Sequence, residues 1–138
     1  MKKLFLISFI TTILIGCGGK NNKITEEYLV GNWDCNYTFF VYDNNSKGYK
    51  EENKESFSSG LEKIDGKLFS EGKQVPFEKA FTTWKSSTKI SGYDVTNDVV
   101  ATKNSDNEFL ITIKSDAYNN SNGEKTLRKS EMLCTRIK

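Results

Sequence analysis

Two serine–lysine pairs are the first residues of this sequence to consider for catalysis. Ser70 stands three residues before Lys73, and Ser86 three residues before Lys89, the spacing at which a lysine can deprotonate a serine nucleophile. Neither pair begins a predicted helix, and the companion motifs of such hydrolases are missing. The chain contains no histidine, which excludes Ser-His and Cys-His nucleophile pairs and the commonest metal ligand. We therefore predict no catalytic residue, no metal site and no cofactor.

Cysteine is the other residue type here with covalent chemistry, and the first of the three cysteines comes after an unusual N-terminus. Residues 1–3 are Met-Lys-Lys, residues 4–15 form a 12-residue run with only Ser8, Thr11 and Thr12 as polar members, and Gly16 comes next. A positive start, an apolar run and a small residue are typical of a secretory signal peptide. The run is shorter than the about 20 residues that a bilayer-spanning helix needs.

The stretch Leu14-Ile15-Gly16-Cys17 resembles the bacterial lipobox. The resemblance implies that residues 1–16 are a cleaved signal peptide and that Cys17 becomes the lipidated first residue of the mature protein. Two or more acyl chains anchor stably where one binds only reversibly. Gly18 stands where an Asp would imply inner-membrane retention in enteric bacteria, so we expect the outer membrane and its periplasmic face. The alternative is an ordinary signal peptide with Cys17 as a small core residue.

Length and charge limit the number of domains and the possible partners of the mature chain. Removing residues 1–16 leaves 122 residues, enough for one domain. We expect a flexible tether over 17–23 and a single domain over 24–138. Without Lys2 and Lys3 the chain has 18 basic and 18 acidic side chains, and it has no basic run that would track phosphates. We therefore expect no nucleic-acid partner.

Cys35 and Cys134 are the two cysteines left once Cys17 is assigned to lipid. In an oxidising compartment they have one possible intramolecular pairing, and we predict a disulfide between them. Two separately buried thiols are the alternative, and a reactive thiol pair is a further one, although redox pairs are usually close in sequence.

Alternating apolar and polar residues predict an all-β domain. Apolar residues occupy every second position from Trp33 to Val41, and again from Phe109 to Ile113, which indicates two strands. Turn formers such as Asp65-Gly66 separate the strands, and a helical turn over 24–28 precedes the first. Residues 49–55 suit either a solvated strand edge or a loop, and residues 77–87 fit either a helix or a strand. Seven to nine strands with polar turns favour a small antiparallel β-barrel, with most aromatic residues in its core.

The predicted disulfide fixes a register between the first and last strands. If Cys35 lies opposite Cys134 on antiparallel neighbours, Trp33 lies opposite Arg136, and an arginine over an indole adds a cation–π interaction. Pairing of the first and last strands would close a barrel. Gly31-Asn32-Trp33 after a helical turn, with Arg136 in the last strand, resembles the lipocalin and fatty-acid-binding (calycin) pattern. The resemblance implies that Gly31, Trp33 and Arg136 close one end of the barrel around a cavity for an apolar ligand.

These observations favour a lipid-anchored envelope lipoprotein that acts as a non-catalytic binding module, with the membrane as one partner and an apolar small molecule as the other. Two alternatives stay open. The first is a lysozyme-inhibitor-like or exclusion lipoprotein that docks on an envelope protein, because the early and late cysteines resemble those of small barrel inhibitors of c-type lysozyme. The second is a structural accessory subunit of an envelope complex.

Overall fold

A computed structural model describes residues 21–138, and it consists almost entirely of one β-sheet. Eight antiparallel strands lie in the order β4-β3-β2-β1-β8-β7-β6-β5, which confirms the all-β expectation and its strand count. The elements are α1 (Glu26–Leu29), β1 (Gly31–Asp43), β2 (Gly48–Ile64), β3 (Lys67–Ser70), β4 (Lys73–Gln74), α2 (Phe77–Ala80), β5 (Trp84–Ile90), β6 (Tyr93–Ser105), β7 (Glu108–Asn119) and β8 (Lys125–Arg136). The predicted signal peptide, Cys17 and the start of the tether lie outside the described residues.

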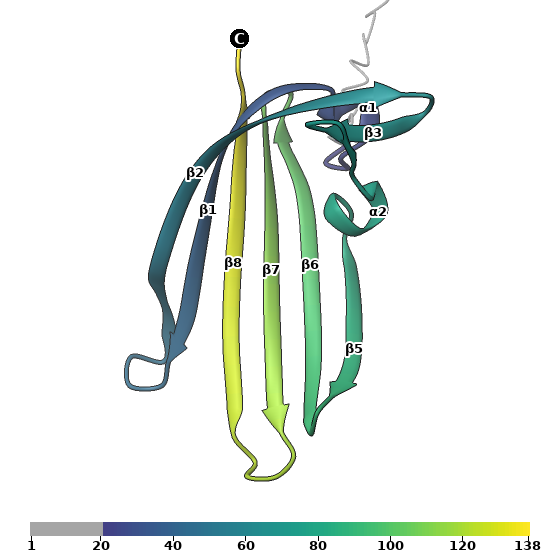
Figure 1. Ribbon diagram of the computed structural model, residues 1–138. Coiled ribbons are helices and arrows are strands. Elements are labelled where there is room, and N and C mark those ends of the chain that lie inside the picture. The colour runs from purple at the N-terminus through teal and green to yellow at the C-terminus, as the bar shows by residue number, and fades with distance from the viewer. Residues whose placement is uncertain (1–20) are drawn as a thin grey trace, which may run out of the picture.

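The sheet curls into a half-barrel rather than a closed ring (Figure 1). The first and last strands pair as expected, but they lie in the middle of the sheet. Its two edges are β4 and β5, which pair with each other nowhere in the described part of the chain. The chain leaves β4 through α2 and enters β5 at Trp84. A helical turn therefore connects the two edge strands, which a closed barrel would join by backbone hydrogen bonds. We call the end of the half-barrel near α1 the α1 end, and the opposite end the hairpin end.

The predicted register of β1 and β8 is confirmed. Cys35 lies opposite Cys134, and the pairing places Trp33 opposite Arg136. The turn at Asp65-Gly66 is also confirmed: both residues have positive φ, +49° and +76°, which suits the turns that match the twist of a two-stranded hairpin.

The two segments with more than one sequence interpretation adopt different structures. Residues 49–55 belong to β2, a single strand of 17 residues, whose outer edge pairs with β3 only from Leu61 to Ile64. Residues 77–87 divide into α2 and the start of β5. Pro76 precedes the helix as its N-cap, where a missing N–H costs nothing.

The hydrophobic core gathers at the α1 end, on the concave face. Its buried members include Ile24, Leu29, Trp33, Cys35, Leu61, Leu68, Phe81, Val99, Phe109, Ile111 and Cys134. The expectation that most aromatic residues lie in the core is wrong for the described chain, where only Trp33, Phe81 and Phe109 are buried. A half-barrel has no opposite wall to cover the inward side chains of its hairpin end, so they stay accessible.

Candidate ligand-binding face of the half-barrel

The three residues predicted to close one end of the barrel meet at the α1 end. The Arg136 guanidinium lies 4.2 Å from the centre of the Trp33 ring, donates a 2.7 Å hydrogen bond to the Val30 carbonyl and donates another to the Tyr28 carbonyl. Gly31 has φ +132°, and a Cβ there would lie 2.6 Å from Arg136 Nη1. A side chain at position 31 would therefore displace the arginine, which explains the glycine.

The same cluster fixes α1 over the end of the sheet. The Thr25 side chain caps the helix by accepting from the Tyr28 N–H. The Trp33 indole donates a 2.7 Å hydrogen bond to the Leu29 carbonyl, and the Tyr28 hydroxyl donates one of 2.9 Å to the Ser105 carbonyl. Burial raises the pKa of the Tyr28 hydroxyl, although the nearby Arg136 charge opposes the shift, so this phenol remains a donor at neutral pH.

A disulfide joins Cys35 to Cys134, as expected. Both half-cystines are buried on the concave face, next to Trp33 and Phe109 in the register. The bridge crosslinks β1 and β8 at the centre of the sheet and forms part of the floor of an apolar cavity.

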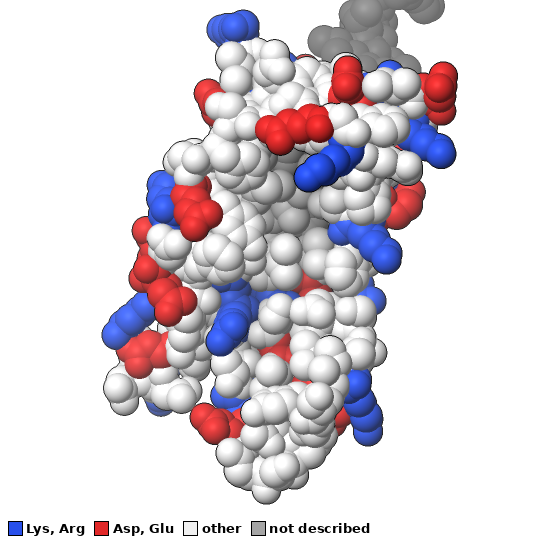
Figure 2. Space-filling model, viewed as in Figure 1, with Lys and Arg blue, Asp and Glu red and all other residues white. Residues whose placement is uncertain are grey.

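This apolar cavity of about 180 Å³ opens on the concave face at the α1 end, and we call it the apolar pocket. Its lining is almost entirely apolar and comes mainly from Trp33, Cys35, Phe57, Leu61, Phe81 and Met132. The hydroxyls of Ser59 and Ser70, which also line it, lie 3.1 Å apart and hydrogen bond to each other. Phe57 is 45% exposed and stands at the mouth. Figure 2 shows the surface hollowed between β1–β2 on one side and α2 on the other.

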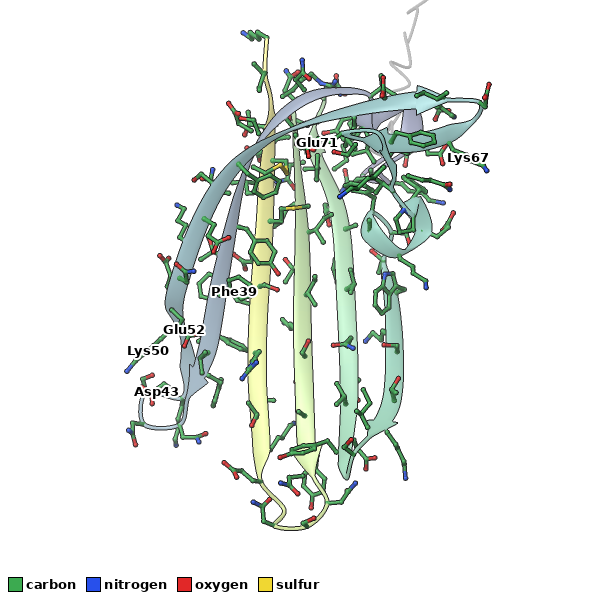
Figure 3. The ribbon with its side chains drawn as sticks, viewed as in Figure 1. Phe39, Asp43, Lys50, Glu52, Lys67 and Glu71 are labelled. Atoms are coloured by element: carbon green, nitrogen blue, oxygen red, sulfur yellow. A yellow bond between two sulfur atoms is a disulfide. The ribbon has the colours of Figure 1, made fainter. Side chains whose placement is uncertain are left out.

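A larger groove of about 480 Å³ lies on the strands toward the hairpin end, and we call it the Arg128 groove. Residues from β1, β2, β7 and β8 line it, among them Phe39, Glu52, Ile113, Arg128 and Ser130. Phe39 is 40% exposed. In Figure 3, Phe39 and Glu52 lie on the β1–β2 side of the sheet, with Glu52 nearer the hairpin end. The groove combines apolar rings with polar and charged groups, unlike the pocket.

Several pocket residues are not predicted by the sequence patterns. Phe57 and Leu61 lie in the segment 56–64, where alternation is weak, and the odd positions there face inward because they pair with Cys35 and Gly31. Met132 differs from them, because the predicted Cys35–Cys134 register already places it opposite Tyr37 on the inward face. Phe81 comes after α2 and reaches the pocket from the helix side, a placement that no periodicity signals.

The two serine–lysine pairs differ in their geometry. Ser70 and Lys73 face each other across the β3–β4 turn, and the Ser70 hydroxyl is engaged by Ser59. Ser86 and Lys89 lie three residues apart on one strand, so their side chains point to opposite faces, and Lys89 is paired with Asp94 at 3.8 Å.

Metal clusters and membrane-spanning helices are both absent from the described residues. Residues 21–138 contain no group of three or more His, Cys, Asp or Glu side chains placed to hold a metal ion. Over the same range, no helix is both long and apolar enough to cross a bilayer. Comparison with protein-family models, with curated proteins and with solved structures found no match to this chain.

Proposed function

We propose that this protein is a lipid-anchored binding module of the bacterial envelope, which holds the apolar group of a small ligand on the concave face of its half-barrel. The observation that supports the proposal best is the apolar pocket. Its walls include Trp33, Leu61 and Met132, and an apolar group that replaces water against such walls is bound favourably. Anchoring through Cys17 rests on the lipobox resemblance, and Gly18 in place of an Asp after it favours the outer membrane and its periplasmic face.

The pocket size defines how much of a ligand it can hold. Its volume of about 180 Å³ is below the roughly 300–1,000 Å³ of pockets for drug-sized ligands, but close to the roughly 150 Å³ of an engineered apolar cavity that binds benzene. The pocket therefore suits one ring or the end of an alkyl chain. The remainder of a larger ligand would lie along the concave face.

A pocket-blocking variant tests this function. We expect Met132→Trp to fill the pocket and abolish binding of benzene or hexanol, measured by calorimetry or ligand-observed NMR. Leu133→Trp is the matched control, because its neighbouring position on β8 points to the convex face, where Leu133 is 36% exposed. Native mass spectrometry of the purified protein would identify a copurified apolar ligand. Equal binding by both variants would contradict the pocket assignment.

The anchor has an independent test. We expect Cys17→Ser to abolish lipid attachment, measured as loss of the acyl mass increment, and to move the protein out of the membrane fraction. Unchanged mass and unchanged fractionation would reject the lipoprotein assignment without affecting the binding proposal.

Protein docking is the second candidate function, because two exposed apolar residues flank the turn between β5 and β6. Ile90 is 56% and Tyr93 43% exposed, and Ser91-Gly92 forms the turn itself with φ of +47° and +83°. A lysozyme inhibition assay on the wild type and on an Ile90→Ser/Tyr93→Ser double variant tests it. Inhibition by the wild type that the double variant lacks would support docking through this hairpin.

A further inference from the structure

One guanidinium in the Arg128 groove has no partner charge. Arg128 lies opposite Val41 on β1 and Ser115 on β7, in phase with Cys134 along β8, so it belongs to the concave face. Its side chain is exposed. None of the ion pairs among residues 21–138 includes it. The groove therefore presents a positive charge that no ion pair within residues 21–138 engages.

The neighbouring cation does not serve the groove. Lys129, the next residue on β8, also borders the groove. Its side chain nevertheless points to the convex face, where the ammonium lies 4.2 Å from the centre of the Phe40 ring and 2.9 Å from a Glu131 carboxylate oxygen. Its charge is satisfied there. Arg128 is thus the cation of this groove that a ligand can use.

The groups around Arg128 suit an anion with several oxygens. A guanidinium offers a planar fork of N–H donors that matches carboxylate and phosphate geometry. Ser130 and Ser115 also line the groove, but the Ser115 hydroxyl donates a 2.7 Å hydrogen bond to the Asn97 side-chain oxygen, so its proton is not available to an anion. Glu52 is the one acid in the lining, so the groove carries an opposing charge that lies beyond ion-pair distance of Arg128.

An apolar path leads from the apolar pocket to this cation. Met132 lines the pocket, and Arg128 lies four positions earlier on the same strand, toward the hairpin end. At about 3.4 Å per residue the two positions are about 14 Å apart. Between them the concave face carries Tyr37 and Phe39, whose rings pack edge to face at 4.6 Å, and Ile113 of the groove lining. An extended alkyl chain fits this spacing.

We propose that the concave face binds an acidic amphiphile, with its apolar end in the pocket and its carboxylate or phosphate on Arg128. This inference rests on the proposed function, since it presumes that the pocket accepts the apolar end. It adds the class of ligand: an alkyl compound with an anionic head, in place of a neutral apolar molecule.

Binding of three matched probes tests the proposal. Dodecanoate, dodecyl phosphate and dodecanol share one alkyl chain and differ in the head group, and each is titrated into the purified full chain below its micelle-forming concentration. We expect at least one acidic probe to bind about tenfold more tightly than dodecanol, since hydrogen bonds to charged groups contribute about one such factor or more. The advantage should shrink as salt is added. The tighter of the two acids identifies the head group.

Charge variants locate the head group. Arg128→Gln should remove the advantage of the acidic probes and leave dodecanol unchanged. Lys114→Gln is the matched control, because it removes one positive charge from the residue beside Ser115, on the opposite face of β7, and should change nothing. Glu52→Gln should strengthen binding of the acids by removing the one acid of the groove.

The outcomes separate the two proposals. If dodecanol binds as tightly as the acids, or if Arg128→Gln leaves acid binding unchanged, the anionic site is wrong while the apolar pocket stands. If none of the three probes binds, the pocket function fails and this inference fails with it.

Discussion

The two ends of the half-barrel are built from the same strands but differ in how their inward faces are covered. On β1, Trp33 is fully buried at the α1 end, whereas Phe39, six residues later on the same face, is 40% exposed. On β8, Arg136 is held by two carbonyls and an indole, whereas Arg128 has no partner charge within the described chain. The α1 end therefore holds the packed core beside the apolar pocket, whereas the inward side chains of the hairpin end stay accessible.

The largest difference between the two ends is expected for aromatic truncation. Trp33→Ala should lower the free energy of unfolding by about 3–5 kcal/mol, because it leaves a cavity beside Phe109 and removes the anchor of α1. Phe39→Ala, on the same strand and face, should cost less than about 1.5 kcal/mol, because much of its ring is already in water. Chemical denaturation of the two variants measures both. Equal losses would show that the hairpin end is also packed.

Removal of the disulfide should have the next largest effect. A Cys35→Ala/Cys134→Ala double variant should lose about 2–4 kcal/mol of unfolding free energy, because the bridge joins residues 99 positions apart in sequence at the border between the core and the open face. Denaturation of the wild type under reducing conditions should reproduce the loss. A double variant that unfolds at the same denaturant concentration as the oxidised wild type would contradict this role.

The two inward arginines of β8 sharpen the comparison further. Arg136→Gln should cost about 1.5–3 kcal/mol, because it removes hydrogen bonds from a charged donor and the contact with Trp33. Arg128→Gln should stay within about 0.5 kcal/mol of the wild type, as expected for a surface position. Thermal melts of the two variants provide the measurement. A large loss for Arg128→Gln would indicate a structural role at odds with ligand binding.

The smallest effect is expected at the tip of the β1–β2 hairpin, where Asp43 and Lys50 lie side by side (Figure 3). The hydrogen bond from Lys50, helped by those from the Asn45 N–H and the Ser46 hydroxyl, lowers the pKa of Asp43 from 3.8 to about 2. A depressed folded-state pKa means that the stabilisation is present above the unfolded pKa of about 4 and is lost as the pH falls toward the folded value.

Asp43→Asn should therefore be slightly less stable than the wild type near neutral pH, and the gap should close as the pH is lowered below about 4. Parallel melts at several pH values measure the gap, and the carboxyl carbon shift of Asp43 by NMR measures the pKa directly. A titration midpoint near the ordinary value would show that the hairpin tip does not hold this ion pair in solution.

The sequence predicted most of the fold because strands and turns are local properties. Period-two alternation located β1 and β7, and Asp65-Gly66 located a hairpin turn. The β1–β8 register came from one assumption, that Cys35 faces Cys134, because a crosslink between neighbouring strands fixes every other pair. The same assumption placed Arg136 over Trp33. Local pattern could not place Phe57 or Phe81 in the pocket, since their contacts depend on how far the sheet curls and where α2 lies.

Local pattern and cysteine chemistry thus predicted an all-β domain, the disulfide and the pairing of Trp33 with Arg136. The lipid anchor at Cys17 rests on the lipobox resemblance and stays a prediction. Only the tertiary structure decided that β4 and β5 stay apart. Closure of a barrel depends on strand tilt, stagger and curvature summed around all strands, and no local pattern contains that sum. The open side results from it, and with it the pocket and the accessible charge of Arg128.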